Sequence, residues 1–175
     1  MEGTVGGNVY LLEGRGLTLI DCGLPGNLRP IVRYIRSIGR DPREMEFIVF
    51  THGHPDHTGT AMALRKMTGA RLAVHPGDAR MDGQSRRWVY YTGQLFTLPW
   101  RIPFAQRVAA DYLVRDNEVL PVLGGLRVLH TPGHTPGSIT LLLEEHGVLF
   151  TGDTLLSNGA RFGRPFPFPG HNEEL

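Results

Sequence analysis

The chain has 175 residues, of which 41% are apolar and 20% are charged, as expected for one folded domain with a sizeable core. Its formal net charge of +1 gives no reason to expect nucleic acid or an anionic membrane surface as a partner. Glycine and proline are frequent, with 23 and 13 copies, but the apolar runs are intact, which favours a loop-rich α/β protein over a disordered chain.

The first predicted elements are a pair of strands and a helix. Residues Asn8 to Glu13 and Leu17 to Asp21 have the pattern of two strands, joined by a glycine-containing connection that is typical of a hairpin. Asn27 is a candidate N-cap for a helix that extends to about Ile38, with apolar residues at helical spacing. Gly39 follows as the predicted C-terminal stop of this helix.

A second unit of strand, helix and strand comes next. Residues Glu46 to Phe50 contain a short, continuous apolar run, which predicts a buried strand. Thr58 to Met67 has the pattern of a helix ended by Gly69, and Arg71 to Val74 predicts the following strand. The alternation of strands and helices in the first half of the chain favours α/β layering.

The stretch T-H-G-H-P-D-H-T-G, from Thr51 to Gly59, contains three of the eight histidines of the chain and one carboxylate within six positions. Imidazole and carboxylate suit zinc and other borderline divalent metals. On an extended segment, His52, His54 and Asp56 would project to one side and His57 would not. This spacing suggests two ligand sets for two neighbouring metals. The alternative, a polar loop rich in histidine by chance, is disfavoured by the density of the cluster.

The second half of the chain supplies mostly strands. Glu118 to Leu123 and Leu126 to His130 flank a Gly-Gly pair, which is a strong hairpin signal. Ser138 to Leu143 and Gly147 to Thr151 predict another strand pair. Two mixed sheets packed face to face, with helices outside, would satisfy both halves. We therefore predict an α/β fold that is a four-layer αββα sandwich.

Residues 79 to 110 combine aromatic residues and arginines without a periodic pattern. Two interpretations stay open for this stretch: it lines a substrate pocket, or it packs onto the domain as a lid. The aromatic residues concerned are Trp88, Tyr90, Tyr91, Phe96, Trp100 and Phe104.

The H-x-H-x-D-H pattern after a buried strand resembles the signature of the metallo-β-lactamase superfamily, whose fold is the αββα sandwich. Two later segments resemble the same family. In the G-H-T-P-G-S segment the resemblance implies that His134 binds the first metal, and His130 is interpreted as a supporting or structural residue. In the T-G-D segment it implies that Asp153 bridges two metals. The alternative for Asp153 is the N-cap of a helix beginning near Leu155.

Asp21 ends the predicted strand L-T-L-I-D and matches an aspartate that this family places beneath the metal loop. Histidines bound to a metal usually donate their other N–H to a carboxylate or a carbonyl. We therefore predict that Asp21 supports a ligand histidine from behind without binding the metal itself.

The resemblance also implies a further histidine ligand well after the bridging aspartate. His171 fits superficially, but Asn172 and the two glutamates after it predict the start of a helix, so we do not assign it as the ligand. Water or another chain are the alternatives. Residues 1–175 are thus predicted to form one metallo-β-lactamase-like domain that lacks the family's C-terminal portion.

The predicted chemistry is hydrolysis assisted by two divalent metal ions, with zinc preferred and iron or manganese left open. His52, His54 and His134 would hold the first ion, and Asp56 and His57 the second, with Asp153 between them. Two ions lower the pKa of a shared water to around 7, so that hydroxide can attack a carbonyl. Asp56 is also a candidate to move a proton to the leaving group.

An aspartate at the bridging position, Asp153, resembles the glyoxalase II-type thioesterases and the lactonases. The predicted substrate is therefore an ester, a thioester or a lactone. Two other hypotheses stay open. One is a persulfide dioxygenase-like oxidoreductase with a single iron, and the other is a non-catalytic fragment of the fold.

Cys22 is the only cysteine, so no internal disulfide forms, which fits a reducing compartment. Met1 to Thr4 lacks the basic and apolar regions of a secretory signal. No apolar run approaches the ~18 residues that cross a bilayer. We expect a cytoplasmic protein that acts on a small molecule, and we leave a homo-oligomer open.

Overall fold

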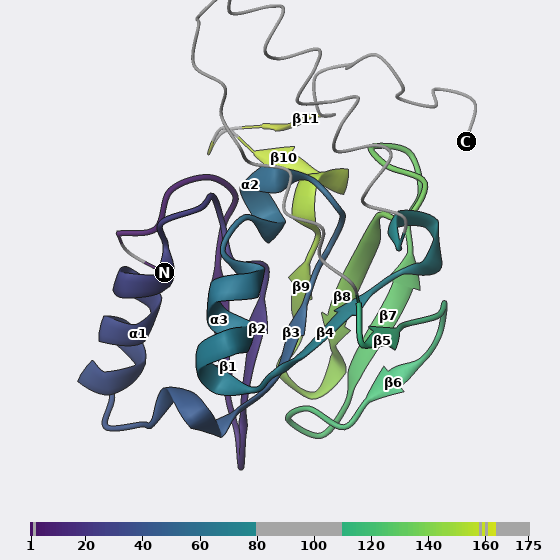
Figure 1. The fold of residues 1–175 in the computed structure, drawn as a ribbon. Coiled ribbons are helices and arrows are strands. Elements are labelled where there is room, and N and C mark those ends of the chain that lie inside the picture. The colour runs from purple at the N-terminus through teal and green to yellow at the C-terminus, as the bar shows by residue number, and fades with distance from the viewer. Residues whose placement is uncertain (2, 80–109, 158, 160, 164–175) are drawn as a thin grey trace, which may run out of the picture.

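The computed structural model describes residues 1, 3–79, 110–157, 159 and 161–163 (Figure 1). The aromatic stretch 80–109 and His171 lie outside the described residues. In chain order the strands, α-helices and short 3-10 helices (η) are β1 (Tyr10–Glu13), β2 (Leu17–Ile20), α1 (Leu28–Ser37), η1 (Pro42–Glu44), β3 (Met45–Val49), α2 (Pro55–Thr58), α3 (Ala61–Thr68), β4 (Arg71–Val74), η2 (Pro76–Asp78), β5 (Tyr112–Leu113), β6 (Val119–Leu120), β7 (Leu126–His130), β8 (Ile139–Leu143), η3 (Glu144–His146), β9 (Val148–Phe150), η4 (Gly152–Thr154), β10 (Leu156–Ser157) and β11 (Phe162–Gly163).

Two sheets pack face to face. The first has the strand order β1-β2-β3-β4-β5, with an antiparallel β1–β2 pair and parallel pairing from β2 to β5. The second has the order β6-β7-β8-β9 and is antiparallel throughout. The first sheet is mixed, as predicted, but the second is not. Tight connections between successive strands allow only antiparallel pairing, whereas parallel neighbours need a long crossover.

Side chains alternate across the first sheet, so each of its faces contributes to a different core. Along β3, Ile48 packs with the helices, whereas Phe47 and Val49 pack against the second sheet. Ile31 and Ile35 of α1 are fully buried in the core on the helical side. Because β3 is covered on both faces, it needs the continuous apolar run that the sequence shows.

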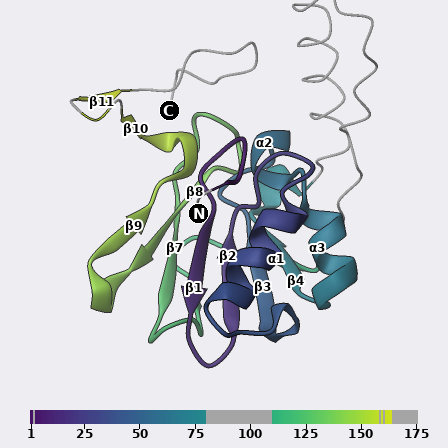
Figure 2. The same cartoon turned by 90° about the vertical axis from the view of Figure 1, so that its left-hand side faces the viewer.

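Helices α1 and α3 lie on one side of the first sheet, and the second sheet lies on its other side (Figures 1 and 2). This layering agrees with the predicted α/β sandwich. In the described part of the chain, no α-helix lies against the outer face of the second sheet. Nor does any described helix combine the length and the apolar composition that crossing a membrane requires.

The predicted elements differ from the observed ones mainly at their ends. The expected helix from Thr58 to Met67 spans parts of two helices. Helix α2 ends at Thr58, and α3 begins at Ala61 after a short turn. Asn27 is the N-cap residue of α1, but its side chain makes no capping bond. Instead, its amide bonds to both backbone groups of Val5, at 3.0 and 2.8 Å, and so anchors the N-terminal segment.

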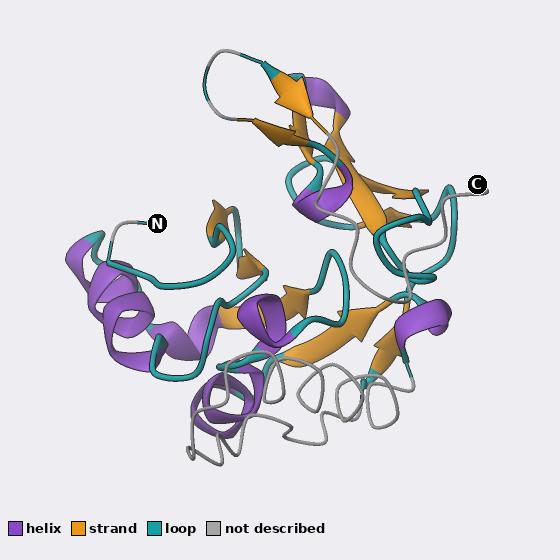
Figure 3. Cartoon of the chain, turned by 90° about the horizontal axis from the view of Figure 1, so that it is seen from above, coloured by secondary structure: helices purple, strands orange, loops and turns teal. Residues whose placement is uncertain are grey.

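The arrangement of strands gathers several loops at one end of the molecule. The carboxyl ends of the parallel strands β2, β3 and β4 point to the same edge. The β7–β8 connection and the chain leaving β9 reach that edge from the second sheet. Figure 3 looks down onto this end, where residues distant in the sequence meet.

We expect a buried and an exposed leucine of the two sheets to respond very differently to truncation. Leu19 is fully buried beneath the helices, whereas Leu149 on the edge strand β9 is 50% exposed. Leu19→Ala should lower the free energy of unfolding by about 2–5 kcal/mol, whereas Leu149→Ala should change it by less than about 0.5 kcal/mol. Urea unfolding measures both, and similar losses at the two positions would contradict the burial of Leu19 in the core and the exposure of Leu149.

Candidate metal centre

The histidine-rich stretch begins where β3 ends and turns sharply at Pro55. His52 and His54 lie in the extended segment before the turn, and Asp56 and His57 lie on α2. The prediction that positions 52, 54 and 56 share one side of an extended segment is therefore wrong for Asp56. Proline at the first helical position is compatible with a helix start. The turn brings the His57 ring to 4.1 Å from the His52 ring, measured between centroids.

Three histidines form a compact group of potential ligands. The ligand atoms of His52, His54 and His134 all lie within 4.8 Å of one another. His54 Nδ1 is 3.1 Å from His52 Nε2 and 2.9 Å from His134 Nε2. The first two residues follow β3 of the first sheet, and His134 lies in the β7–β8 connection of the second. The structure thus brings together the three residues expected to hold the first metal.

A second compact group consists of His52, His57 and Asp153. His57 Nε2 lies 3.4 Å from Asp153 Oδ1, and His134 Nε2 lies 3.6 Å from Asp153 Oδ2. The carboxylate of Asp153 therefore lies between His57 of the second group and His134 of the first. His57 Nε2 is buried and has no hydrogen-bond partner among the described residues. A buried nitrogen of this kind, aimed at a carboxylate, fits a divalent cation as its partner.

Two other predicted site residues lie less centrally. Asp56 Oδ2 is 3.7 Å from His57 Nε2, but Asp56 belongs to neither compact group, and its side chain is 36% exposed. His130 lies further out, where its Nε2 is 3.0 Å from the Pro136 carbonyl oxygen. Its ring stacks on that of His75, with centroids 3.9 Å apart. His130 thus braces the loop that carries His134.

The T-G-D segment forms the 3-10 helix η4 and does not begin an α-helix. Strand β10 starts at Leu156, so the alternative role of Asp153 as an α-helix N-cap is wrong. Gly152 has a φ of 51° and lies against Thr51, where an added Cβ would come within 2.5 Å of Oγ1. Only glycine fits this close approach, which sets Asp153 opposite the histidine-rich stretch.

Asp21 lies beneath the cluster and joins two of its parts. One carboxylate oxygen accepts a hydrogen bond from the Thr51 backbone N–H at 2.8 Å, and the other accepts one from the Thr51 hydroxyl at 2.7 Å. The same second oxygen is 2.8 Å from His57 Nδ1. This contact fixes the orientation of His57 and leaves its Nε2 toward the second group, as a ligand histidine requires.

The charges and burial around the histidines separate them into two kinds. Burial, reinforced by neighbouring histidines, lowers the pKa of His52 well below its ordinary value and that of His54 to about 3. Burial also disfavours the charged form of His57, but Asp21, Asp153 and Asp56 outweigh it and raise its pKa to about 10. Thus His52 and His54 offer neutral lone pairs, whereas His57 carries a proton that a metal would displace.

Asp78 is a buried residue of this region that we did not predict from the sequence. It follows β4 in η2 and hydrogen-bonds to residues in both metal-ligand loops. The available signal was its position after a strand whose parallel neighbour carries the histidine-rich stretch. Its neighbours His75, Pro76 and Gly77 indicated only a turn.

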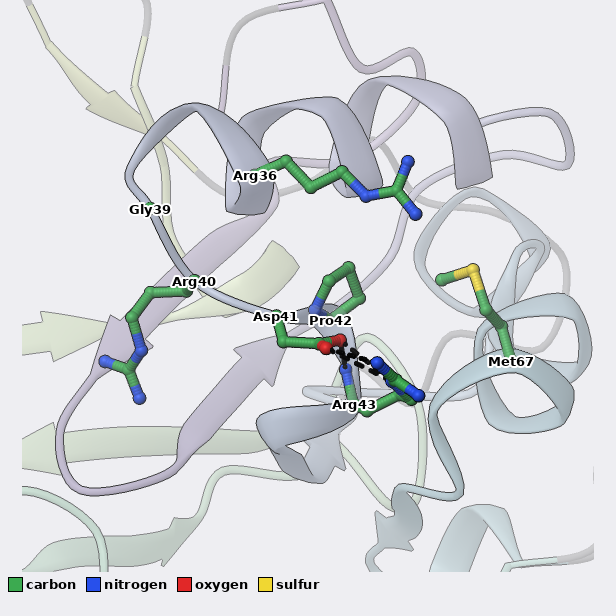
Figure 4. Close-up of a pocket in the computed structure, with 7 residues that line it drawn as sticks. All are labelled: Arg36, Gly39, Arg40, Asp41, Pro42, Arg43 and Met67. Atoms are coloured by element: carbon green, nitrogen blue, oxygen red, sulfur yellow. Dashed lines mark hydrogen bonds and ion pairs between the residues drawn. The ribbon is translucent and has the colours of Figure 1, made fainter.

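Neither the cysteine nor the hollow shown in Figure 4 belongs to this site. Cys22 is fully buried, burial raises its pKa, and its thiol donates to the His57 carbonyl oxygen at 3.2 Å. The hollow, of about 400 Å³, lies near η1 at the opposite end of the first sheet (Figure 4). Two of its arginines already form ion pairs, Arg40 with Glu44 and Arg43 with Asp41.

Comparison with known proteins gives consistent results. A family model described as the Metallo-beta-lactamase superfamily matches residues 3–174. The uncharacterized protein YobT of Bacillus subtilis (strain 168) is 29% identical, over 93% of this chain and 70% of its own length. A hydroxyacylglutathione hydrolase of Anaeromyxobacter dehalogenans is 35% identical, over 86% of this chain and 46% of its own length.

A solved structure of a metallo-beta-lactamase family protein from Thermus thermophilus has a TM-score of 0.69 and 30% identity to this chain. The match covers 87% of this chain and 56% of the other. The predicted metallo-β-lactamase-like sandwich is thereby confirmed. The chain spans 46% and 50% of the length of two curated hydroxyacylglutathione hydrolases that it matches.

The lowered pKa of His54 predicts an acid-sensitive metal-free protein. Because the folded-state pKa of about 3 lies below the ordinary 6.5, the stabilising contribution of His54 is fully present above pH 6.5. It is lost as the pH falls from 6.5 toward 3. Over this range the free energy of unfolding of metal-free wild type should therefore fall by up to about 1.4 kcal/mol per pH unit more than that of His54→Gln.

Urea unfolding of both metal-free proteins between pH 6.5 and about 4.5 measures this difference. His146→Gln, an exposed substitution in η3, is the matched control and should keep the wild-type slope. Parallel curves for wild type and His54→Gln would contradict the prediction.

Proposed function

The chain belongs to the metallo-beta-lactamase superfamily, and on that premise we propose that it is a metal-dependent hydrolase that acts on an ester, thioester or lactone carbonyl. The observation that carries this proposal is the convergence of His52, His54 and His134 from two different sheets, with Asp153 facing them. A purely structural loop has no need to bring three imidazoles, two buried and one half-buried, so close together, because burial removes their hydration.

The donor set suits two divalent cations, with zinc the preferred identity. His52, His54 and His134 would hold the first ion. His57 and Asp56 would hold the second, and Asp153 would lie between the two. When bound, such ions polarise a carbonyl oxygen and bring the pKa of a coordinated water to about 7.

The remaining side chains position these donors and move protons. Asp21 holds His57 through Nδ1, so that only Nε2 of that ring is directed toward the second group. Asp56 is the most exposed carboxylate of the site, and its oxygen lies 3.7 Å from His57 Nε2. An exposed carboxylate at the rim can exchange protons with solvent, so Asp56 is our candidate for protonating the leaving group.

The relatives suggest where to look for the substrate. Hydroxyacylglutathione hydrolases recur among the matched proteins, at 35% and 30% identity in two of them. Their name denotes hydrolysis of a thioester of glutathione. We therefore propose thioesters as the first substrate class to test, followed by lactones and simple esters. The bridging role proposed for Asp153 resembles that in glyoxalase II-type thioesterases and lactonases, and so fits thioesters and lactones equally.

The hydrolase is favoured over the two other hypotheses. A persulfide dioxygenase-like site with a single iron would use two histidines and one aspartate, which is the composition of the second group alone, and it would leave His54 and His134 of the first group without a role. The hydroxyacylglutathione hydrolases among the relatives also favour hydrolysis. A non-catalytic fragment would give no reason for the neutral, preoriented imidazoles of His52 and His54.

Removing one shared donor should abolish both metal binding and turnover. His52 belongs to both compact groups, so His52→Ala should leave less than about one metal ion per chain and reduce turnover by at least ~10³-fold. Elemental analysis and thioester hydrolysis measure the two effects on the same preparation. His146→Ala removes an exposed histidine that belongs to neither compact group and serves as control. Full turnover by metal-free protein would overturn the proposal.

Asp56→Asn should separate proton transfer from metal binding at the first site. The amide keeps the size of the side chain but cannot donate a proton as an acid, so kcat should fall about 10²–10⁴-fold. Because Asp56 is also a proposed donor to the second ion, elemental analysis should still find at least about one metal ion per chain, which the intact first group would hold. An unchanged kcat with normal metal content would remove Asp56 from the proposed mechanism.

A further inference from the structure

Asp78 is 3% exposed and lies between the two loops that carry the first group of histidines. We propose that Asp78 is a positioning residue that fixes the spacing between these loops and thereby sets the affinity of the first metal site. This inference rests on the proposed metal centre. It concerns a residue that contacts none of the ligand nitrogens and acts only through the backbone and side chains beside them.

The contacts of Asp78 connect the two loops. From the first loop, the backbone N–H of Gly53, which stands between His52 and His54, donates to Oδ2 at 2.9 Å. From the second loop, the hydroxyl of Thr135, the residue after His134, donates to Oδ2 at 2.7 Å.

The backbone N–H of Gly137, also in the second loop, donates to Oδ1 at 2.9 Å. Each donor therefore lies within three positions of a predicted metal ligand. The carboxylate thus joins segments that follow strands of different sheets.

The fit around this carboxylate is too close to be incidental. A Cβ at position 137 would collide with the backbone nitrogen and the carboxyl carbon of Asp78, so glycine is required there. At position 77 an added Cβ would lie 2.6 Å from the carbonyl oxygen of Pro136. The η2 turn and the His134 loop are therefore packed backbone against backbone, with the carboxylate between them.

Asp78 is not itself a candidate ligand. Both of its oxygens accept hydrogen bonds from protein donors, and it belongs to neither group that could hold a metal ion in the described part of the chain. Its role follows from the number of donors that it accepts from. Two backbone N–H groups and a hydroxyl converge on it, and only a carboxylate accepts from all three at once.

Asparagine cannot reproduce this arrangement. If its oxygen faced Gly53 and Thr135, its NH₂ would meet the N–H of Gly137, and the reverse orientation would set the NH₂ against the N–H of Gly53. Either way, one donor loses its acceptor and the two loops separate. The His134 ring would then move relative to His52 and His54, whose ligand atoms lie close to it.

The test compares Asp78→Asn with wild type in zinc binding. Competition with a chromophoric chelator gives the dissociation constant of the first zinc, and it should be about 10–100-fold weaker in the variant, as found for residues that support metal ligands. Cobalt substitution provides a second readout, because the visible absorption of cobalt reports ligand geometry and should change in intensity. A role in folding alone would lower the unfolding midpoint of the metal-free protein without altering either readout.

Asp116→Ala is the matched control. Asp116 also accepts a backbone N–H bond near the second loop, from His130 at 2.8 Å, and its other oxygen accepts from the Asn117 side chain at 2.8 Å. The zinc affinity of this variant should stay within about twofold of wild type. An unchanged zinc affinity in folded Asp78→Asn would overturn the role of Asp78 but not the proposed metal centre. If wild type itself bound no zinc, the proposed metal centre would fail instead.

If Asp78→Asn does not fold, two variants of Thr135 test the same inference. Thr135→Ser keeps the hydroxyl that donates to Asp78, whereas Thr135→Val removes it at nearly constant volume. The serine variant should bind zinc within about twofold of wild type and the valine variant at least about fivefold more weakly. Equal affinities in the two folded variants would overturn the proposal.

Discussion

The rest of the site depends on the contacts that the buried carboxylate of Asp21 makes. It is 2% exposed, and a charge so buried is tolerated only where donors surround it. Thr51 supplies two of them and His57 faces it, so one side chain sets both the start of the histidine-rich stretch and a ring on α2. Asp21 itself has a φ of 55°, a left-handed conformation unusual for a non-glycine residue. Such backbone strain is typical of functional sites, where the surrounding contacts outweigh it.

Close to Asp21, the protein brings several imidazole rings together. The His52 ring lies 4.7 Å from the rings of both His54 and His134, between centroids. Burial and the neighbouring histidines both oppose protonation of His52 and His54. The cluster is therefore a source of instability in the metal-free fold that a bound cation would remove. A site of this kind is better explained by metal binding than by folding, because folding alone gains nothing from it.

Local sequence patterns were sufficient for the elements and for much of the site. The apolar run of β3 and the alternation of strands and helices identified the first sheet, because both depend on nearby residues. The predicted ligand residues lie in short motifs, so they could be identified as candidates one segment at a time. The antiparallel pairing of the second sheet follows from the short connections between its strands. Asp78 gave no local signal, because its partners are 25, 57 and 59 positions away. The side chain of Asn27 shows the same limit, since it bonds to Val5 instead of capping its own helix.

The two ligand groups are not equivalent, and the difference follows from their neighbours. His52 and His54 are surrounded by other imidazoles and are held neutral, so a cation can bind there without displacing a proton from either ring. Burial opposes a charge on His57 as well, but Asp21, Asp153 and Asp56 surround it and raise its pKa to about 10. A cation at His57 must therefore compete with a proton, but the same carboxylates that hold the proton would also attract the cation. The first group is thus suited to a metal by its neutral, closely spaced imidazoles and the second by its negative charge, and Asp153, between His57 and His134, is the carboxylate proposed to serve both.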